Sequence, residues 1–134
     1  LALVIFSIFT FALPTATAAE ISDIEPYYIG LSRITLSLYV QPTALGADFA
    51  TVYGLVRLYS GYSADVTLTL QRSLNEEDWE EVETWESSGE VEIRITDELY
   101  VVSGYSYRLA ILVIVYYEDG SAAEIVTKYG PIQP

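Results

Sequence analysis

The chain has 134 residues, a net charge of −13 at pH 7, and no Cys, His or Met. Without Cys and His it has no zinc site of the usual kind, no haem or iron–sulfur ligands from these residues, no disulfide and no catalytic triad. The excess of acidic side chains, 19 against 6 basic ones, repels phosphate backbones and argues against a nucleic-acid partner.

An uncharged apolar run, Leu1 to Leu13, opens the sequence and is followed by small residues. Ala16-Thr17-Ala18 has the small-x-small form of a signal peptidase site, and cleavage after Ala18 or Ala19 fits. The run is shorter than the about 20 residues that span a bilayer. We therefore predict a signal peptide at 1–19, truncated at its N-terminus because no basic region precedes the run, and a secreted protein; a buried core segment is the alternative.

Downstream of an extended segment at 20–31, apolar and polar residues alternate with a period of two. Ile34, Leu36 and Leu38 alternate with Thr35 and Ser37, for example. This pattern predicts antiparallel strands in a domain at 32–134. The predicted strands cover 34–40, 50–59, 65–71, 79–85, 91–96, 105–117 and 123–128.

Turn residues separate these strands. A loop is expected at Ser73 to Asp78, a break at Ser87-Ser88-Gly89, and a hairpin at Glu118-Asp119-Gly120-Ser121. Asp-Gly in that hairpin favours a type I′ turn, because both residues tolerate positive φ angles.

Seven short strands in about 110 residues predict an all-β, seven-stranded antiparallel sandwich of the immunoglobulin or fibronectin type III kind. An eight-stranded barrel is the runner-up. Tyr107, three residues after Gly104 at the start of the long penultimate strand, is the candidate for a structural tyrosine corner. Tyr105 competes for that role, and both are otherwise ordinary strand tyrosines.

Several short motifs point to one family. They are Pro26-Tyr27-Tyr28, Tyr59-Ser60-Gly61, the segment Val66 to Arg72, Trp79 with Trp85, Ser88-Gly89, and the segment Gly104 to Leu109. In this layout the chain resembles small secreted β-sandwich proteins of Gram-positive bacteria, a domain of unknown function. The resemblance implies a bacterial origin, the sandwich fold and export; it implies no catalytic residues.

Acidic residues are concentrated between Glu76 and Glu92, which hold nine of the 19. Blocks of like charge favour a solvated face, with a Ca²⁺ site as the alternative because Ca²⁺ prefers oxygen ligands. No nucleotide-binding, nucleophile-elbow or EF-hand motif is present. A carboxylate pair for glycoside hydrolysis lacks a cleft that would desolvate one acid. We predict no enzyme activity, no cofactor and no resident metal.

Trp79 and Trp85 are six residues apart, so one continuous strand would place both on the same face with Glu81 and Glu83 between them. Exposed on a sandwich, such a face would suit stacking on sugar rings. A bulge between the two tryptophans would instead separate them and bury one. The interpretation that we favour is that one tryptophan fills the core and the other caps its edge, because large aromatic residues dominate cores.

Tyrosine is abundant, with 12 residues. Tyr39, Tyr53 and Tyr59 fall on the polar sides of their strands, which predicts an outer surface or a subunit contact; plain β-propensity is the alternative. The edge strands and the segment 20–31 could also pair with the sheet edge of a neighbour.

These features predict a secreted, non-catalytic interaction or cell-surface module, with Trp79, Trp85, Glu81, Glu83, Tyr53 and Tyr59 as the candidate interaction residues. The first alternative is a carbohydrate-binding module that uses Trp79 and Trp85 with surface tyrosines. The second is a subunit of an extracellular assembly formed by strand addition. The expected partner is a protein or a glycan, with no nucleic acid and no stable membrane insertion of the mature chain, and oligomer formation stays open.

Overall fold

The structure is a computed structural model that describes residues 28–44 and 46–134. The predicted signal peptide, 1–19, and most of the segment 20–31 lie outside the described residues. The strands are β1 (Leu31–Pro42), β2 (Ala47–Leu58), β3 (Ser63–Ser73), β4 (Glu80–Glu90), β5 (Glu92–Val102), β6 (Ser106–Tyr116) and β7 (Ala122–Tyr129). In this part of the chain, no helix is long and apolar enough to cross a membrane.

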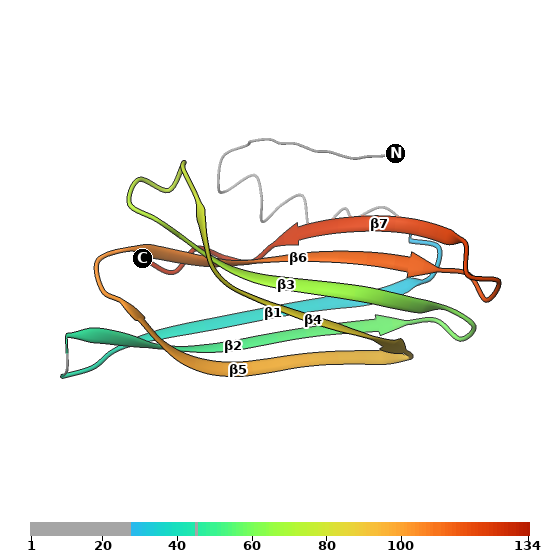
Figure 1. Cartoon of the computed structure of the whole chain (residues 1–134), viewed down its shortest axis with the longest axis horizontal. Helices are drawn as coiled ribbons and strands as arrows, with labels where there is room; N and C mark the ends of the chain where they lie inside the picture. The colour runs from blue at the N-terminus through green and yellow to red at the C-terminus, as the bar shows by residue number, and fades with distance from the viewer. Residues whose placement is uncertain (1–27, 45) are drawn as a thin grey trace.

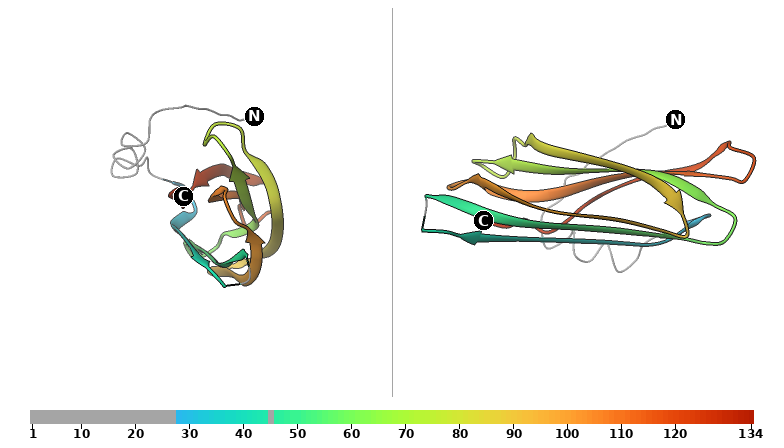
Figure 2. Two further views of the ribbon diagram at one scale, coloured as in Figure 1. Left: turned by 90° about the vertical axis from the view of Figure 1, so that its left-hand side faces the viewer. Right: turned by 60° about the horizontal axis from the view of Figure 1, so that its bottom comes forward.

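The seven strands form two antiparallel sheets (Figure 1). One has the order β1-β2-β5 and the other the order β4-β3-β6-β7. The two sheets pack against each other as two layers (Figure 2). The predicted all-β sandwich is therefore confirmed, and the strand order is compatible with the immunoglobulin or fibronectin type III type.

The core lies between the sheets and follows the period of two in each strand. Leu68 and Leu70 of β3, Val113 and Val115 of β6, and Val56 of β2 are all fully buried. Each such aliphatic side chain contributes about 1.5–3 kcal/mol through burial. β3 and β6 are the two central strands of their sheet, so their inward rows form the middle of the core.

The chain crosses from one sheet to the other at Val91, not at Ser87-Ser88-Gly89. That predicted break is wrong, because β4 continues through it and the Ser88 hydroxyl donates to the Asp65 carboxylate at 2.7 Å. Val91 has a φ of 65° and links β4 directly to β5. A Cβ at Gly89 would lie 3.3 Å from Ile93 Cγ1. Glycine at this position therefore allows Ile93 of β5 to pack closely against β4, and it does not end the strand.

The hairpin between β6 and β7 lies where it is predicted, but its turn is of another type. Gly120 has a φ of 90°, whereas Asp119 is not among the residues with positive φ. The Tyr117 amide donates to Ser121 O and the Gly120 amide to Tyr117 O, at 2.8 and 2.9 Å. The loop is therefore three residues long with a left-handed glycine at its end, an arrangement that places the positive φ on glycine alone.

The start of β1 is fastened to β7 by one carboxylate. Glu124 accepts hydrogen bonds from the amides of Ile29, Gly30 and Leu31, at 2.6, 3.4 and 3.4 Å. A Cβ on Gly30 would lie 2.4 Å from the Tyr62 ring, so only glycine fits there. Leu31 is 2% exposed and opens β1, so the sandwich begins one residue before the predicted boundary at 32.

Candidate functional site

The two tryptophans lie on opposite faces of the four-stranded sheet and not on the one face where a continuous strand would place them. Trp85 pairs with the buried Leu68 and packs against the core. Its indole Nε1 donates to the Asp97 carboxylate at 2.8 Å, which bridges β4 to β5 of the other sheet. Trp79 precedes β4 and lies against Arg108, whose neighbours along β6 are buried, so Trp79 is on the outer face.

A bulge in β4 is the cause. Glu83 pairs with Leu70 and Glu81 with Gln71, which leaves Val82 as an extra residue. One extra residue reverses the direction of every side chain before it. The structure therefore has the bulge that the sequence offers as an alternative, with Trp85 against the core.

Arg108 lies between two aromatic rings on that outer face. Its guanidinium carbon is 4.2 Å from the ring centre of Trp79 and 4.2 Å from that of Tyr129. Its Nε donates to Gln71 Oε1 at 2.8 Å. Burial lowers the pKa of Arg108 below its ordinary value. Because a guanidinium stays charged in proteins, the stack is a fixed cationic and aromatic group.

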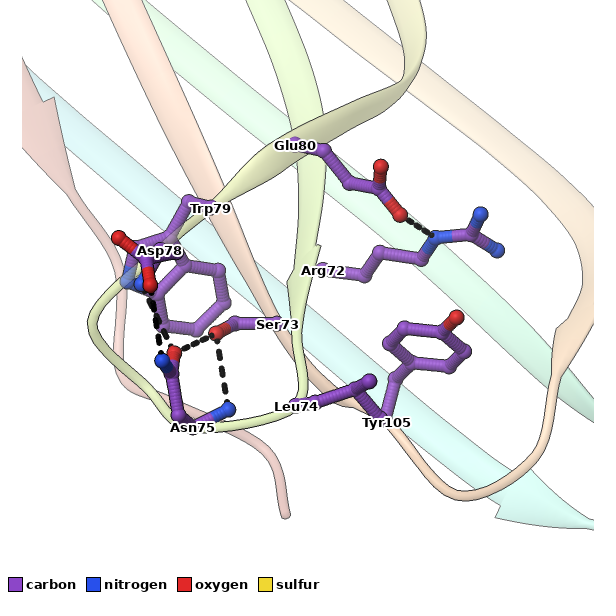
Figure 3. Close-up of a pocket in the computed structure, with 8 residues that line it drawn as sticks. All are labelled: Arg72, Ser73, Leu74, Asn75, Asp78, Trp79, Glu80 and Tyr105. Atoms are coloured by element: carbon purple, nitrogen blue, oxygen red, sulfur yellow. Dashed lines mark hydrogen bonds and ion pairs between the residues drawn. The ribbon is translucent and has the colours of Figure 1, made fainter.

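Beside Trp79 there is an open hollow of about 350 Å³ at one end of the sandwich (Figure 3). We call it the Trp79 hollow. It is lined by Arg72, Ser73, Leu74, Asn75, Asp78, Trp79, Glu80 and Tyr105. It therefore combines two aromatic rings with a guanidinium, two carboxylates and an amide.

The loop that forms the hollow is held by its own short polar side chains. The Ser73 hydroxyl accepts from the amides of Asn75 and Glu76 at 3.2 and 2.9 Å. The Asn75 side-chain oxygen accepts from the amides of Glu77 and Asp78 at 2.9 and 2.8 Å. These bonds fix the backbone between β3 and β4 in the way that Asx and Ser turns do.

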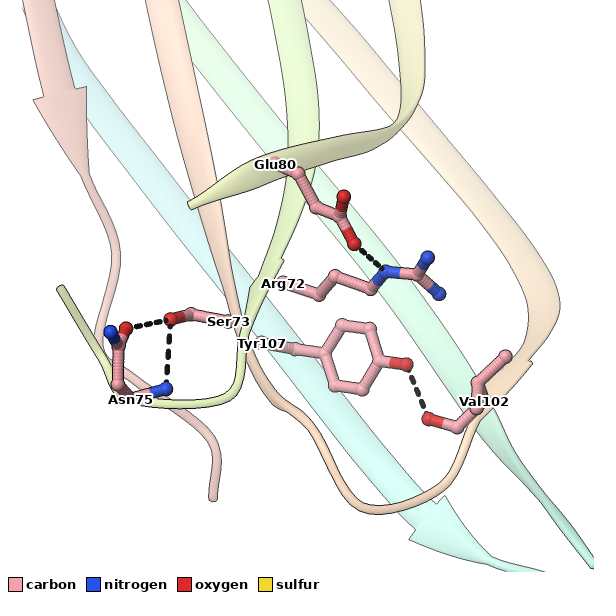
Figure 4. Close-up of polar contacts among 6 residues, drawn as sticks. All are labelled: Arg72, Ser73, Asn75, Glu80, Val102 and Tyr107. Carbon is pink, nitrogen blue, oxygen red and sulfur yellow. Dashed lines mark hydrogen bonds and ion pairs between the residues drawn. The ribbon is translucent and has the colours of Figure 1, made fainter. Parts of the chain in front are cut away.

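Arg72 forms the opposite wall of the hollow. Its Nε donates to Glu80 Oε1 at 2.6 Å (Figure 4), and its guanidinium lies 4.4 Å from the ring centre of Tyr105. The hydrogen bond to Glu80 raises the pKa of Arg72, so this side chain remains a cation at the rim.

Tyr107 is buried next to this wall, with 1% of its surface exposed. Its hydroxyl donates to the main-chain oxygen of Val102, five residues upstream (Figure 4). This hydrogen bond back to the main chain a few residues upstream, here to the last residue of β5, is the contact that defines a tyrosine corner. Tyr105 has its ring under Arg72 instead. Burial raises the pKa of Tyr107 above that of free tyrosine.

Glu81 and Glu83 are both exposed, and each accepts a hydrogen bond from Thr84. Glu81 accepts from the Thr84 hydroxyl at 2.7 Å, and Glu83 accepts from the Thr84 amide at 3.1 Å. Within residues 28–44 and 46–134, no group of three or more acidic side chains is arranged to hold a metal ion.

Tyr53 and Tyr59 lie away from both tryptophans. Tyr53 is half-buried on the outer face of β1-β2-β5, and Tyr59 is 54% exposed in the turn after β2. The structure thus does not bring the six predicted interaction residues together.

A different aromatic group covers the outer face of β1-β2-β5. Tyr100 pairs with Phe49 across β5 and β2, with ring centres 5.1 Å apart. Tyr39 of β1 pairs with Thr51, midway between Phe49 and Tyr53 of β2. Tyr39 is 60% exposed and Tyr100 63%. We call Tyr39, Phe49, Tyr53 and Tyr100 the aromatic face.

Sequence reasoning missed Phe49, Tyr100 and Arg108 as surface residues. A signal for Phe49 was available, because it has the same parity as Tyr53 and therefore points outward. No pattern in the sequence marks Arg108, since the two rings that stack on it, those of Trp79 and Tyr129, come from separate parts of the chain.

No family model matches the chain, and no curated protein matches it with significant similarity. The resemblance to small secreted proteins of Gram-positive bacteria stays a prediction.

Proposed function

We propose that the chain is a secreted, non-catalytic binding module that holds a protein partner on the aromatic face. Export is supported by the apolar run at Leu1 to Leu13 and the small residues that follow it. The observation that carries the binding proposal is the exposure of Tyr39 and Tyr100 on the same outer face of the sheet β1-β2-β5. Contiguous exposed aromatic side chains on a soluble protein mark interaction sites.

The composition of this surface favours a protein over other partners. Between the rings lie the small polar residues Ser37, Thr51 and Thr96 on the outer face, together with Glu98, which pairs with Thr51. Tyrosine surrounded by Ser and Thr is typical of paratopes, because tyrosine provides large contact area at low entropic cost while the hydroxyls adapt their hydrogen bonds.

The test compares two variants of the exported chain in pull-downs from cell-surface and extracellular fractions. In one, Tyr39→Ser is combined with Tyr100→Ser. The matched control is Tyr59→Ser, which removes an equally exposed ring outside the aromatic face. A partner captured by the parent and the control should be lost from the double variant, with its Kd raised at least about 100-fold if each ring contributes about 1.4 kcal/mol. Identical capture by all three proteins would refute the proposal.

A second candidate function is carbohydrate binding in the Trp79 hollow. The hollow joins aromatic rings, for stacking on a sugar, to Glu80, Asp78 and Asn75, which can bind sugar hydroxyls. Its volume of about 350 Å³ lies near the lower end of the usual range for ligand sites. Trp79→Ala should abolish retention on cell-wall polysaccharide, whereas Trp85→Phe, on the other face of the sheet, should leave it unchanged. Equal retention of Trp79→Ala and the parent would rule this function out.

A further inference from the structure

The edge of the three-stranded sheet at β1 is incompletely closed. β1 pairs only with β2 in the described part of the chain. Its inward residues Ile34, Leu36, Leu38 and Val40 remain partly exposed although they pack against the core. Of the inward residues of the opposite edge, β5, three are buried, since Ile93, Ile95 and Val101 are 4–8% exposed, whereas Leu99 is half-buried and Asp97 is exposed. The sandwich is therefore open along β1.

Charge also distinguishes this edge from the other three. β1 has Arg33 as its one charged residue and no acid. β4 carries five glutamates, β5 carries Glu92, Asp97 and Glu98 beside Arg94, and β7 carries Glu124 and Lys128. Charged residues on an edge strand prevent pairing with other chains. In a chain with a net charge of −13, β1 is the edge strand that carries no carboxylate, so an identical copy can approach it without bringing an acidic side chain to the contact.

We infer that β1 pairs antiparallel with β1 of a second copy, so that the protein forms a twofold symmetric dimer. Such an interface is self-complementary, since each residue meets its counterpart by rotation. The sequence of β1 suits a register centred on Leu36. In that register Leu36 faces Leu36 of the second copy, Ile34 faces Leu38, and Arg33 faces Tyr39, which allows a cation–π contact.

The same register preserves the faces of the sheet. In this register, even-numbered residues of β1 pair with even-numbered residues of the second copy, and odd-numbered with odd-numbered. Apolar side chains therefore remain on the inner side of the sheet, and Thr35 meets Ser37 on the outer side. Pro42, which cannot donate a main-chain hydrogen bond, falls just beyond the paired stretch. The dimer would have one continuous sheet with an aromatic face at each end, but the inference does not depend on the proposed function of that face.

The experiment is sedimentation velocity of the exported chain from about 1 µM to about 1 mM, the range of a weak to moderate Kd. We expect a monomer–dimer equilibrium that shifts toward the dimer at about 0.5 M salt, because screening weakens the repulsion between the two copies. A monomer throughout this range, at low and high salt, would overturn the inference.

Two variants with equal added charge test whether the dimer contact lies at β1. Ser37→Glu adds a carboxylate at an exposed position of β1, and the dimer would place two of them about 7–8 Å apart as diagonal neighbours. Thr127→Glu adds the same charge at an exposed position of edge strand β7. Ser37→Glu should raise the Kd at least about tenfold and Thr127→Glu should leave it nearly unchanged. Equal effects, or a dimer untouched by Ser37→Glu, would contradict pairing through β1.

A cross-link tests the register without reliance on a destabilised variant. The chain has no cysteine, so Leu36→Cys introduces a single thiol per copy. On the twofold axis the two Cα atoms would be about 4.5–5.5 Å apart, a distance that a disulfide requires. Mild oxidation should yield a covalent dimer of Leu36→Cys and not of Thr127→Cys. A covalent dimer from neither variant, or from both equally, would exclude the register centred on Leu36.

Discussion

Removal of the Tyr107 hydroxyl tests how the end of the sandwich is held. Tyr107 is 1% exposed, and its hydroxyl donates to the main-chain oxygen of Val102. Tyr107→Phe keeps the ring and its packing but deletes this hydrogen bond, which costs about 1–2 kcal/mol when one partner is removed. For a domain of this size the expected fall in Tm is roughly 5–10 °C.

Thermal and urea denaturation followed by circular dichroism would measure the change. The urea midpoint should fall while the m-value stays constant, because the surface exposed on unfolding is nearly the same. Tyr105→Phe is the matched control, since the ring of Tyr105 contacts Arg72 and no hydrogen bond of its hydroxyl is seen among the described residues. If Tyr107→Phe proved as stable as Tyr105→Phe, the structural role of this hydrogen bond would be refuted.

Three further changes should have measurable effects. Gly30→Ala forces a Cβ to 2.4 Å from the Tyr62 ring, so it should destabilise the fold by about 1–3 kcal/mol in urea denaturation; an unchanged midpoint would contradict the close approach. Trp85→Phe removes the hydrogen bond from the indole to Asp97 and should cost about 1–2 kcal/mol in the same assay, whereas no loss would mean that this bridge between sheets is not stabilising. Burial raises the pKa of Tyr107, so its contribution is complete below the unfolded tyrosine pKa of about 10 and is lost as the pH rises through the higher folded value. Denaturation series from neutral to alkaline pH should therefore show a smaller alkaline loss in Tyr107→Phe than in the parent, and equal losses would exclude this residue as a cause.

Most of the fold could be predicted because each strand alternates with a period of two. The alternation from Ile34 to Val40 places β1 correctly, and Asp119-Gly120 places the last hairpin. The crossing at Val91 could not be predicted, since a β-branched residue with positive φ is an outlier that tertiary packing imposes. Gly89 looked like the break because glycine has two uses, a turn or a close approach, and sequence does not separate them.

The site was less predictable than the fold. A bulge at Val82 separates the two tryptophans, and nothing in the residues from Trp79 to Trp85 announces it. The aromatic face depends on which strands become neighbours. Phe49 and Tyr100 are 51 positions apart in sequence and meet only because β2 pairs with β5.

The long-range pairing of the strands has a consequence for how the chain reaches this structure. The pairing of β2 with β5 joins residues 35 to 55 positions apart, and the pairing of β3 with β6 joins residues 33 to 53 positions apart. Folding dominated by such non-local pairing takes milliseconds to seconds, during which apolar strands lack their partners. Charge next to an unpaired strand suppresses aggregation, so we expect the five glutamates of β4 to act as gatekeepers in that interval. The acidic segment would then protect the chain most before its fold is complete.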